Sequence, residues 1–464
     1  MNYSRYRNTI AITYSIVLFL DRLDLTIVNI TLPTVAKYFG VPIIVTDWIS
    51  LAFLLALAIS IPLGNWLSNK YGTKIIYVLA MCVFGLGSTL SIFANSLNQL
   101  IILRFLQGIG GGVLIPVGMT IIYRLYDKSE YASITSFMFI PSLIAPAVAP
   151  FFGGIILDIF GWKSVFVCSG PICLFTACYS WIYLRADNNY KFKYPLDKLG
   201  FILLALILLI IFYCLSQVGR SGLSLIVIIE ILALLPLSWL FIQVEKKIKY
   251  PLINLDYFKN SIFIKANLVQ LCFQFCHFGA IFLIGMFLQM GVGFIASLAG
   301  LMMGMQAVGA ILISRYSVRL FNRYNPQLPI IIGLLGIAVL SPLIMLVNSV
   351  TFIWFGLGIF LIRGLFSGLC GVPIQVLSVI NFDKSEVGEI NGIFNICRQI
   401  SISLGVAISS LLISLGLYLK QVDSNLMITK SLSIEVFQYG FYAISVVALL
   451  GVWITSKLDL KNLN

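Results

Sequence analysis

Charged residues are scarce in this chain, and their scarcity excludes a water-soluble fold. Only 10% of the 464 residues are charged and 60% are hydrophobic, whereas a soluble domain carries about 25% charged residues. The single histidine excludes a histidine-rich metal site. The sequence also lacks a Walker loop for ATP, and its loops lack the clustered carboxylates or histidines that a membrane-embedded acyl- or glycosyltransferase needs. We therefore expect a membrane protein that is not an enzyme.

Apolar runs of roughly 20 residues recur along nearly the whole chain, and each can cross a hydrocarbon core of about 30 Å as a helix. Only helices and closed barrels span lipid, and these runs are too long and unbroken for barrel strands. The sequence predicts an all-α membrane protein with fourteen transmembrane helices. Their expected ranges are 9–34, 44–67, 74–94, 98–124, 130–157, 163–184, 197–217, 223–243, 261–289, 294–318, 327–347, 350–379, 386–418 and 434–456.

The nine cysteines do not indicate a disulfide framework, because most lie inside apolar runs, where thiols behave as small hydrophobic groups. Cys272, Cys276 and His277 share one helix, and a soft-metal site is the alternative there. No second cluster of ligands accompanies them in the sequence. We expect no metal and no cofactor.

The basic residues predict the topology. An even number of helices places both termini on one side, and that side is cytoplasmic if basic residues gather there. Most of the 30 basic residues then fall in cytoplasmic segments, chiefly 185–198 and 245–260, and few fall outside. The net charge of +13 is thereby explained by topology and contact with anionic lipid, and no nucleic-acid partner is expected.

An internal repeat suggests two related units. The sequence DKSE at residues 127–130 recurs at residues 383–386, each copy reading as a capping box before a helix. Arg104 has a counterpart in Arg363 at nearly the same offset. These repeats predict an N-terminal six-helix half at 1–185, a linker with inserted helices seven and eight at 186–258, and a C-terminal six-helix half at 259–464.

Local sequences resemble those of a known family. Residues 19–33 read FLDRLDLTIVNITLP. Further matching segments follow in order: RFLQG at 104–108, APFFGG at 149–154, GW at 161–162, FLQ at 287–289, AGL at 299–301, Asn395, and RQ at 398–399. As an ordered set, they resemble the major facilitator superfamily, in particular its fourteen-helix drug:proton antiporter branch, which includes multidrug-resistance B-type and quaternary-ammonium exporters. The resemblance covers most of the chain.

The resemblance implies a fold of two halves around a central cavity, and alternating access between the two sides of a bacterial inner membrane. It implies efflux of small amphipathic or cationic organic compounds, driven by inward proton flow. The alternatives are an exporter of one endogenous metabolite or siderophore, a proton-coupled symporter, and a channel. A periplasmic adaptor and an outer-membrane channel are implied partners if the source has two membranes.

Asp24 is the residue most expected to carry the chemistry. A lone carboxylate at the bilayer centre costs roughly 2.5 to 3.5 kcal/mol, so it is either paired or partly neutral. Helix geometry places Asp24 and Arg104 within reach of each other. The resemblance gives both residues proton-coupling roles; the alternative is an ion pair that only locks helix packing. Asp21 lies one turn from Asp24 and is a further proton-coupling candidate, although Arg22 is expected to neutralise it.

Two further segments resemble family motifs with departures. The loop around Asn69, Lys70, Gly72 and Lys74 resembles the cytoplasmic gating loop, but Asn69 replaces its aspartate and leaves the latch without an ion pair. The helix at 130–157 resembles the antiporter motif in its Pro146, Pro150, Gly153 and Gly154, although Ala149 stands where glycine is usual. Prolines bend a helix, so this one is expected either to rock or to hold a static kink.

Polar side chains form stripes on three helices, and polar stripes in lipid must face protein or water. They are expected either to line the substrate cavity or to join helices by hydrogen bonds. The residues expected in the cavity are Gln107, Gln270, Gln274, His277, Asn395 and Arg398. His277 is a weaker candidate than Asp24 for proton transfer.

Overall fold

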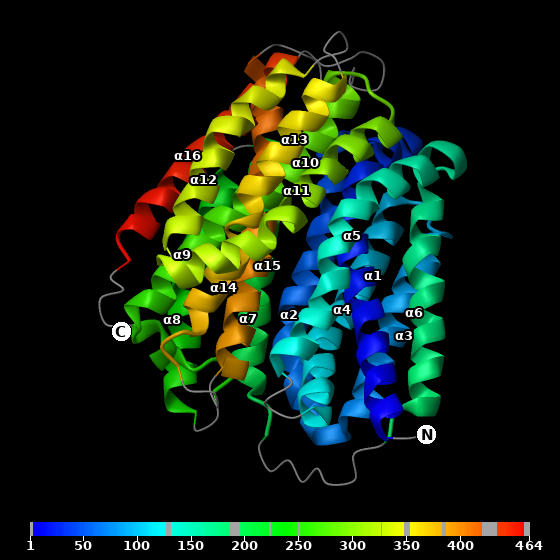
Figure 1. Ribbon diagram of the computed structural model, residues 1–464, viewed down its shortest axis with the longest axis vertical. Helices are drawn as coiled ribbons and strands as arrows, with labels where there is room; N and C mark the ends of the chain where they lie inside the picture. The colour runs from blue at the N-terminus through cyan, green and yellow to red at the C-terminus, as the bar shows by residue number, and fades with distance from the viewer. Residues whose placement is uncertain are drawn as a thin grey trace.

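The computed structural model is a bundle of long helices (Figure 1). It describes residues 3–126, 131–185, 195–221, 224–248, 251–325, 327–347, 353–382, 387–419 and 434–458. Every regular element in these residues is a helix, as expected from the apolar runs. Both copies of the DKSE repeat, 127–130 and 383–386, lie outside the described residues. The division at 185 and 258 stays a prediction.

The first six helices form a group that we call the N-half. Its members are α1 (Tyr3–Phe39), α2 (Asp47–Tyr71), α3 (Thr73–Ser91), α4 (Leu97–Leu125), α5 (Tyr131–Phe160) and α6 (Lys163–Tyr183), with the turn η1 (Ile43–Thr46) between α1 and α2. α4 packs against α2 and α3, and α1 packs against α5 and α6. Glycines make the α2–α4 contact close, because a Cβ at Gly108 or Gly112 would collide with backbone carbonyls of α2.

The last helices form a second group, the C-half. Its members are η3 (Leu255–Lys259), α9 (Ser261–Gln274), η4 (Phe275–Gly279), α10 (Ala280–Met286), η5 (Phe287–Gly291), α11 (Ala296–Arg323), α12 (Gln327–Leu343), η6 (Ile344–Leu346), α13 (Ile353–Gly368), α14 (Gly371–Val379), α15 (Val387–Leu419), η8 (Ile434–Phe437) and α16 (Gln438–Ser456). α11 packs against α13 through Gly309 and Gly364, whose added Cβ atoms would meet backbone of the facing helix. This contact parallels that between α2 and α4.

Two helices lie between the halves in the sequence. α7 (Lys198–Ser221) packs against α8 (Leu225–Lys247), and also against α2 of the N-half and α15 of the C-half. α8 exposes large apolar side chains over much of its surface, as a lipid-facing helix does. Glu230, on α8, is half-buried, and its Oε2 has no hydrogen-bond partner among the described residues.

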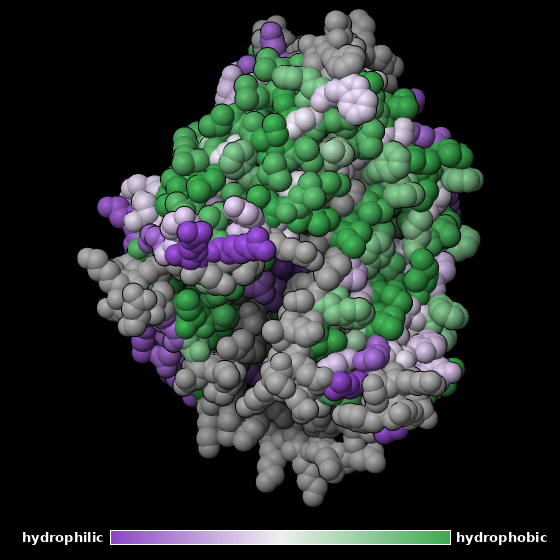
Figure 2. Space-filling model, in the orientation of Figure 1, coloured by the Kyte–Doolittle hydropathy of each residue, from purple (hydrophilic) through white to green (hydrophobic). Residues whose placement is uncertain are grey.

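Within the described residues, eleven helical segments are long and apolar enough to cross a membrane. Each of the fourteen expected ranges holds helix, but α1, α5 and α7 do not qualify over their described residues. In α1 the charged residues Asp21, Arg22 and Asp24 near the middle lower the hydropathy. Hydrophobic side chains dominate the upper and middle part of the face seen in Figure 2, as expected for a surface in lipid. The count of fourteen crossings stays a prediction.

The structure differs from the expected ranges at two interruptions. The range 261–289, expected as one helix, contains π-turns at Phe275–Gly279 and Phe287–Gly291. The range 350–379 is divided at residues 369–370 into α13 and α14. A π-turn inserts one residue without changing hydropathy, so the apolar pattern carries no sign of it. The first π-turn holds Cys276 and His277.

Candidate functional site

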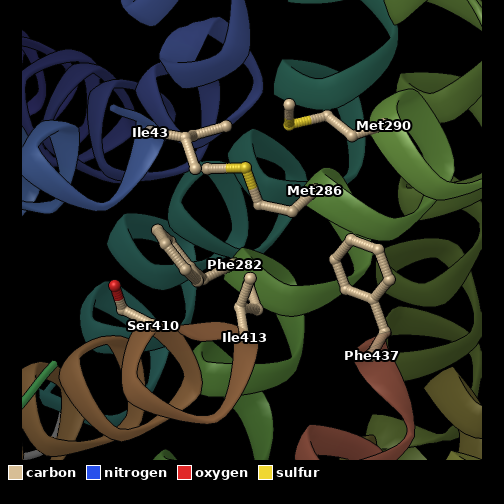
Figure 3. A pocket seen from close by; sticks show the side chains of 7 residues that line it. All are labelled: Ile43, Phe282, Met286, Met290, Ser410, Ile413 and Phe437. Carbon is tan, nitrogen blue, oxygen red and sulfur yellow. The ribbon is translucent and has the colours of Figure 1, made fainter. Parts of the chain in front are cut away.

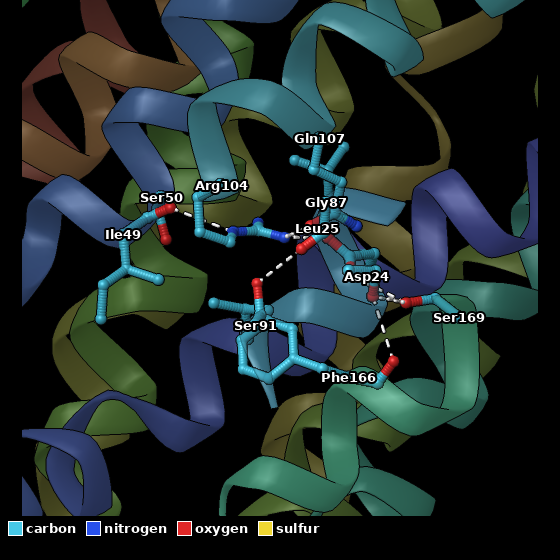
Figure 4. Close-up of polar contacts among 12 residues, drawn as sticks. Asp24, Leu25, Ile49, Ser50, Gly87, Ser91, Arg104, Gln107, Phe166 and Ser169 are labelled. Atoms are coloured by element: carbon cyan, nitrogen blue, oxygen red, sulfur yellow. Dashed lines mark hydrogen bonds and ion pairs between the residues drawn. The ribbon is translucent and has the colours of Figure 1, made fainter. Parts of the chain in front are cut away.

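A buried ion pair joins α1 to α4. The Nη1 atom of Arg104 donates a hydrogen bond to Oδ2 of Asp24, and each side chain is 1% exposed (Figure 4). The same Nη1 donates to Oε1 of Gln107 at 2.6 Å, and Nε donates to the carbonyl of Ile49 on α2 at 3.2 Å. The contact expected between Asp24 and Arg104 is therefore confirmed; their roles in proton coupling stay predictions.

Other helices hold the two charged groups in place. Ser169 of α6 donates its Oγ hydrogen to Oδ1 of Asp24 at 3.2 Å, and its Oγ lies 2.8 Å from that of Ser88 on α3. The guanidinium of Arg104 lies over the ring of Phe53, 4.5 Å from the ring centre, in a cation–π contact. Sequence reasoning missed Ser169, because a serine in an apolar helix carries no sign of its partner.

The charge on Asp24 bears on how α1 and α4 are held together. While Asp24 is ionised, it is the only carboxylate that accepts a hydrogen bond from Arg104 among the described residues. Protonation would remove the negative charge and leave Arg104 with two neutral acceptors, Gln107 and the Ile49 carbonyl. A buried charge that loses its partner is strongly destabilised. A proton on Asp24 would therefore favour rearrangement of α1 against α4.

Asp21 lies beside this pair in a different environment. It is buried, and neither carboxylate oxygen accepts a hydrogen bond among the described residues. Nε of Arg22 lies 3.7 Å from its Oδ2, as the sequence led us to expect. Asp21 also interacts electrostatically with Asp24, with Arg104 and with Arg398 of the C-half. Through Asp21, the charged residues of α1 and α4 extend toward α15.

The arginine at the corresponding place in the C-half has different partners. Arg363 of α13 is fully buried; Nη1 donates to Oε1 of Gln306 on α11 at 2.7 Å, and Nη2 donates to the carbonyl of Cys276 at 2.9 Å. Its Nε has no partner, and no carboxylate forms an ion pair with it in the described part of the chain. The repeat therefore keeps a buried arginine in both halves, but among the described residues Arg363 has no acidic partner that corresponds to Asp24.

The polar stripes fall into two places. Gln107 lies with Arg104 inside the N-half, whereas Gln270, Gln274 and His277 lie on α9 and η4, which pack against α15 with its Asn395 and Arg398. Several of these residues, and Gln399 next to Arg398, carry buried polar atoms without a partner among the described residues. These atoms are Oε1 of Gln274, Nδ1 of His277, Nε of Arg398, and both amide atoms of Gln399. His277 stacks on Phe273.

Two small cavities lie along α10. One encloses about 20 Å³, room for a single water, and is lined by residues that include Thr26 of α1 with His277 and Gln306 of the C-half. The other is an apolar crevice of about 10 Å³ (Figure 3), lined by Ile43, Phe282, Met286, Met290, Ser410, Ile413 and Phe437. Both join residues of the two halves.

The gating-loop residues surround a tight turn between α2 and α3. Gly72 has a φ of 94°, a conformation that favours glycine, so its expected part in the turn is confirmed. The ammonium of Lys70 lies over the ring of Trp66 at 4.6 Å, and that of Lys74 lies over Trp181 of α6 at 5.1 Å. The side chain of Asn69 lies outside the described residues.

The antiporter-motif glycines of α5 allow close approach of neighbouring helices. A Cβ at Gly153 would collide with Ile27 of α1, and a Cβ at Gly154 with backbone of Ala296 and Ser297 at the start of α11. Nearby, Oδ2 of Asp158 accepts a hydrogen bond from the backbone N–H of Ser297 at 2.9 Å, which caps α11 from the other half. No pattern in the sequence indicates this cap. The side chains of Pro146 and Pro150 lie outside the described residues.

Comparisons with known proteins agree with this architecture. Residues 14–406 match the family described as Major Facilitator Superfamily. The relatives named "Putative multidrug resistance protein MdtD" from Salmonella heidelberg (strain SL476) and Salmonella typhimurium (strain LT2) are 26% identical, over 95% of this chain and 92% of theirs.

Solved structures share the fold. A bacterial homologue of the human lysosomal transporter Spinster, in an inward-facing and unoccupied conformation, has a TM-score of 0.68 at 17% identity, covering 97% of this chain and 96% of that one. A D-xylose-proton symporter has a TM-score of 0.65 at 14% identity, covering 97% of each chain.

Proposed function

Because the chain belongs to the Major Facilitator Superfamily, whose members are membrane transporters and not enzymes, we propose that it exports small amphipathic organic compounds in exchange for protons. Export proceeds by alternating access, with the two halves rocking about the central contacts. The relatives named as multidrug resistance proteins support efflux as the direction. We place the chain in a bacterial inner membrane with both termini in the cytoplasm, where its basic segments would lie.

The observation that carries proton coupling is the Asp24–Arg104 pair. Its carboxylate is buried, holds a guanidinium, and contacts Ser169 of a third helix. Proton uptake at Asp24 frees Arg104, and proton loss restores the pair, so the proton biases an equilibrium between two helix arrangements. A carboxylate that never titrated would serve as packing only, which is the competing explanation.

Contacts between the halves indicate which conformation the structure represents. The hydrogen bonds found between described residues of the two halves are those from Ser297 to Asp158 and from Nε2 of Gln289 to the carbonyl of Ile30. With the proposed topology, these residues lie near the outer surface, because α1 runs outward and α5 ends there. In the described residues the halves thus meet on the outside, so we assign the structure to an inward-facing arrangement, which must break the Asp158 cap to open outward.

The experiment that tests the proposal is transport in proteoliposomes. The purified protein is reconstituted, the vesicles are loaded with a chemically diverse panel of labelled compounds, and a pH jump is imposed in either direction. Exchange predicts that compound and proton move oppositely and that each gradient drives the other. Movement of both in one direction would replace exchange with symport. Compound flow that ignores the pH gradient would remove proton coupling altogether.

A further inference from the structure

Charge is distributed unequally between the interiors of the two halves. In the N-half, Asp24 pairs with Arg104 and Asp21 lies beside Arg22, so acids and bases balance. The acids of residues 259–464 are Asp383, Glu386, Glu389, Asp423, Glu435 and Asp459, and none of them lies deep within an expected helix. Arg363 and Arg398 do. Arg398 lies eleven residues after the start of α15, about 16 Å along the helix.

Within the described residues, neither C-half arginine has an acid of its own half to balance it. Arg363 is held by the neutral oxygens of Gln306 and Cys276, and its Nε has no partner in the part of the chain that the structure describes. Arg398 makes no hydrogen bond within the described residues, and the charged groups that act on it, Arg22 and Asp21, belong to α1. α15 packs on α2 of the N-half as well as on α7 and α9, which places the helix that carries Arg398 at the boundary between the halves.

Counted together, the charged groups named here carry a positive net charge: Asp21, Arg22, Asp24, Arg104, Arg363 and Arg398. Four guanidinium groups and two carboxylates give +2 when all are ionised, and protonation of either carboxylate raises the charge further. In a medium of low dielectric constant this excess repels cations strongly and attracts anions. Next to Arg398 in the sequence, both amide atoms of the buried Gln399 are without a partner among the described residues. They supply hydrogen-bonding capacity next to the unbalanced charge.

From this juxtaposition we propose that the transported compound carries an anionic group, a carboxylate or a group of similar charge, which binds between the halves beside Arg398, with Arg363 adding to the positive potential. The proposal rests on the proposed function in assuming that the space between the halves receives the cargo. Of the two expected classes, amphipathic or cationic compounds, it keeps the amphipathic class and replaces the cationic one.

The apolar crevice of Figure 3 is lined partly by the helix that carries Arg398, and at about 10 Å³ it would receive the remainder of such a molecule only after its lining side chains move apart. Phe282, Met286 and Met290 line it from the segment that follows His277, and Ser410 and Ile413 line it from α15, the helix that carries Arg398. Aromatic rings and flexible methionines adapt to varied apolar shapes. Ser410 lies about 18 Å from Arg398 along the helix. The cargo class is therefore an amphipathic anion with its apolar body toward the crevice.

Exchange of an anion for a proton has an electrical consequence. Outward movement of a monovalent anion and inward movement of one proton both carry positive charge inward. An inside-negative membrane potential therefore drives both steps of export. One-for-one exchange of a monovalent cation for a proton would move no net charge.

The test measures equilibrium binding to the full-length protein in detergent, without any gradient. The probes are naphthoate, naphthamide and naphthyltrimethylammonium, which share one apolar body and differ in charge. We expect naphthoate to bind about tenfold or more tightly than the other two, the range expected when a hydrogen bond to a charged group is added. Arg398→Gln should reduce naphthoate affinity to that of naphthamide and leave naphthamide unchanged.

Lys265→Gln is the matched control, because Lys265 is also a cation of the C-half, but its Nζ is exposed and donates to the carbonyl of Lys457. It should leave all three affinities unchanged. Arg363→Gln is a second variant; should it fail to fold, half-buried Arg398 still decides the result. Preference for the ammonium probe, equal binding of all three, no binding of naphthoate, or unaltered naphthoate binding to Arg398→Gln would each overturn the proposal. Tight naphthoate binding without proton-coupled transport would instead refute the proposed function alone.

Discussion

Replacing Asp24 with asparagine separates a coupling role from a packing role. Asparagine keeps the shape of the side chain and an oxygen for Arg104, but it removes the charge. Arg104 is then a buried cation held by Gln107 and the Ile49 carbonyl. Breaking a buried pair at one partner costs about 3 to 5 kcal/mol of folding free energy. Because the amide oxygen is retained, we expect a loss at the lower end of that range, about 3 kcal/mol. We expect Asp24→Asn to be folded, less stable, and unable to couple transport to protons.

The double variant makes the experiment decisive. Arg104→Gln in the Asp24→Asn background removes the unpaired charge, so stability should recover while gradient-driven transport stays absent. Asp21→Asn is the matched control on the same helix; its oxygens accept no hydrogen bond among the described residues, so transport should be affected less. Thermal stability is measured in detergent and transport in proteoliposomes after a pH jump. Normal proton-driven transport by Asp24→Asn would refute the reasoning and direct attention to Asp21 or His277.

Three other predictions concern topology and movement. A cysteine at position 190 should resist membrane-impermeant reagents in intact cells, because segment 185–198 is expected in the cytoplasm; labelling from outside would reverse the topology. Asn69→Asp restores an acid to the gating loop and should shift distances between spin labels on the two halves toward the outward-open state; unchanged distances would exclude a latch there. Gly154→Ala places a Cβ against Ala296 and Ser297 and should loosen the outer contact, destabilising the inward-facing state by about 1 to 3 kcal/mol, which the same distance measurement detects.

The features that could be predicted from the sequence are mainly those for which the lipid environment imposes a large energetic cost on any alternative. A charged side chain in an apolar helix needs a partner, so the pairing of Asp24 with Arg104 follows from position and charge. Helix positions follow from the length of apolar runs. Gly72 was predictable because a tight turn favours glycine. In each case the feature is associated with a large free-energy difference and can be recognised in a short stretch of sequence.

Features that depend on neutral groups from distant helices were not predictable. Ser169 of α6 hydrogen-bonds to Asp24, and Gln306 of α11 hydrogen-bonds to Arg363. A serine or glutamine in a helix can form its hydrogen bonds with many different partners, so its partner cannot be predicted from its position. The π-turn at Phe275–Gly279, which precedes α10, leaves the hydropathy pattern unchanged. The cap of α11 by Asp158 joins residues from opposite halves, so only the packed arrangement reveals it.

An anionic cargo sets a demanding condition on coupling. A proton on Asp24 raises the net charge of the six groups from +2 to +3, so electrostatics alone would make proton and anion bind together, which is the linkage of a symporter. Exchange requires that the conformational effect of protonation outweigh this electrostatic attraction. Protonation must release Arg104 and populate the outward-facing state, in which the anion binds more weakly. Naphthoate binding to the wild-type protein distinguishes the two, because exchange predicts weaker binding as the pH falls and symport predicts stronger binding. Asp24→Asn should remove the pH dependence in either case, and a dependence that persists in this variant would place the coupling proton on another group.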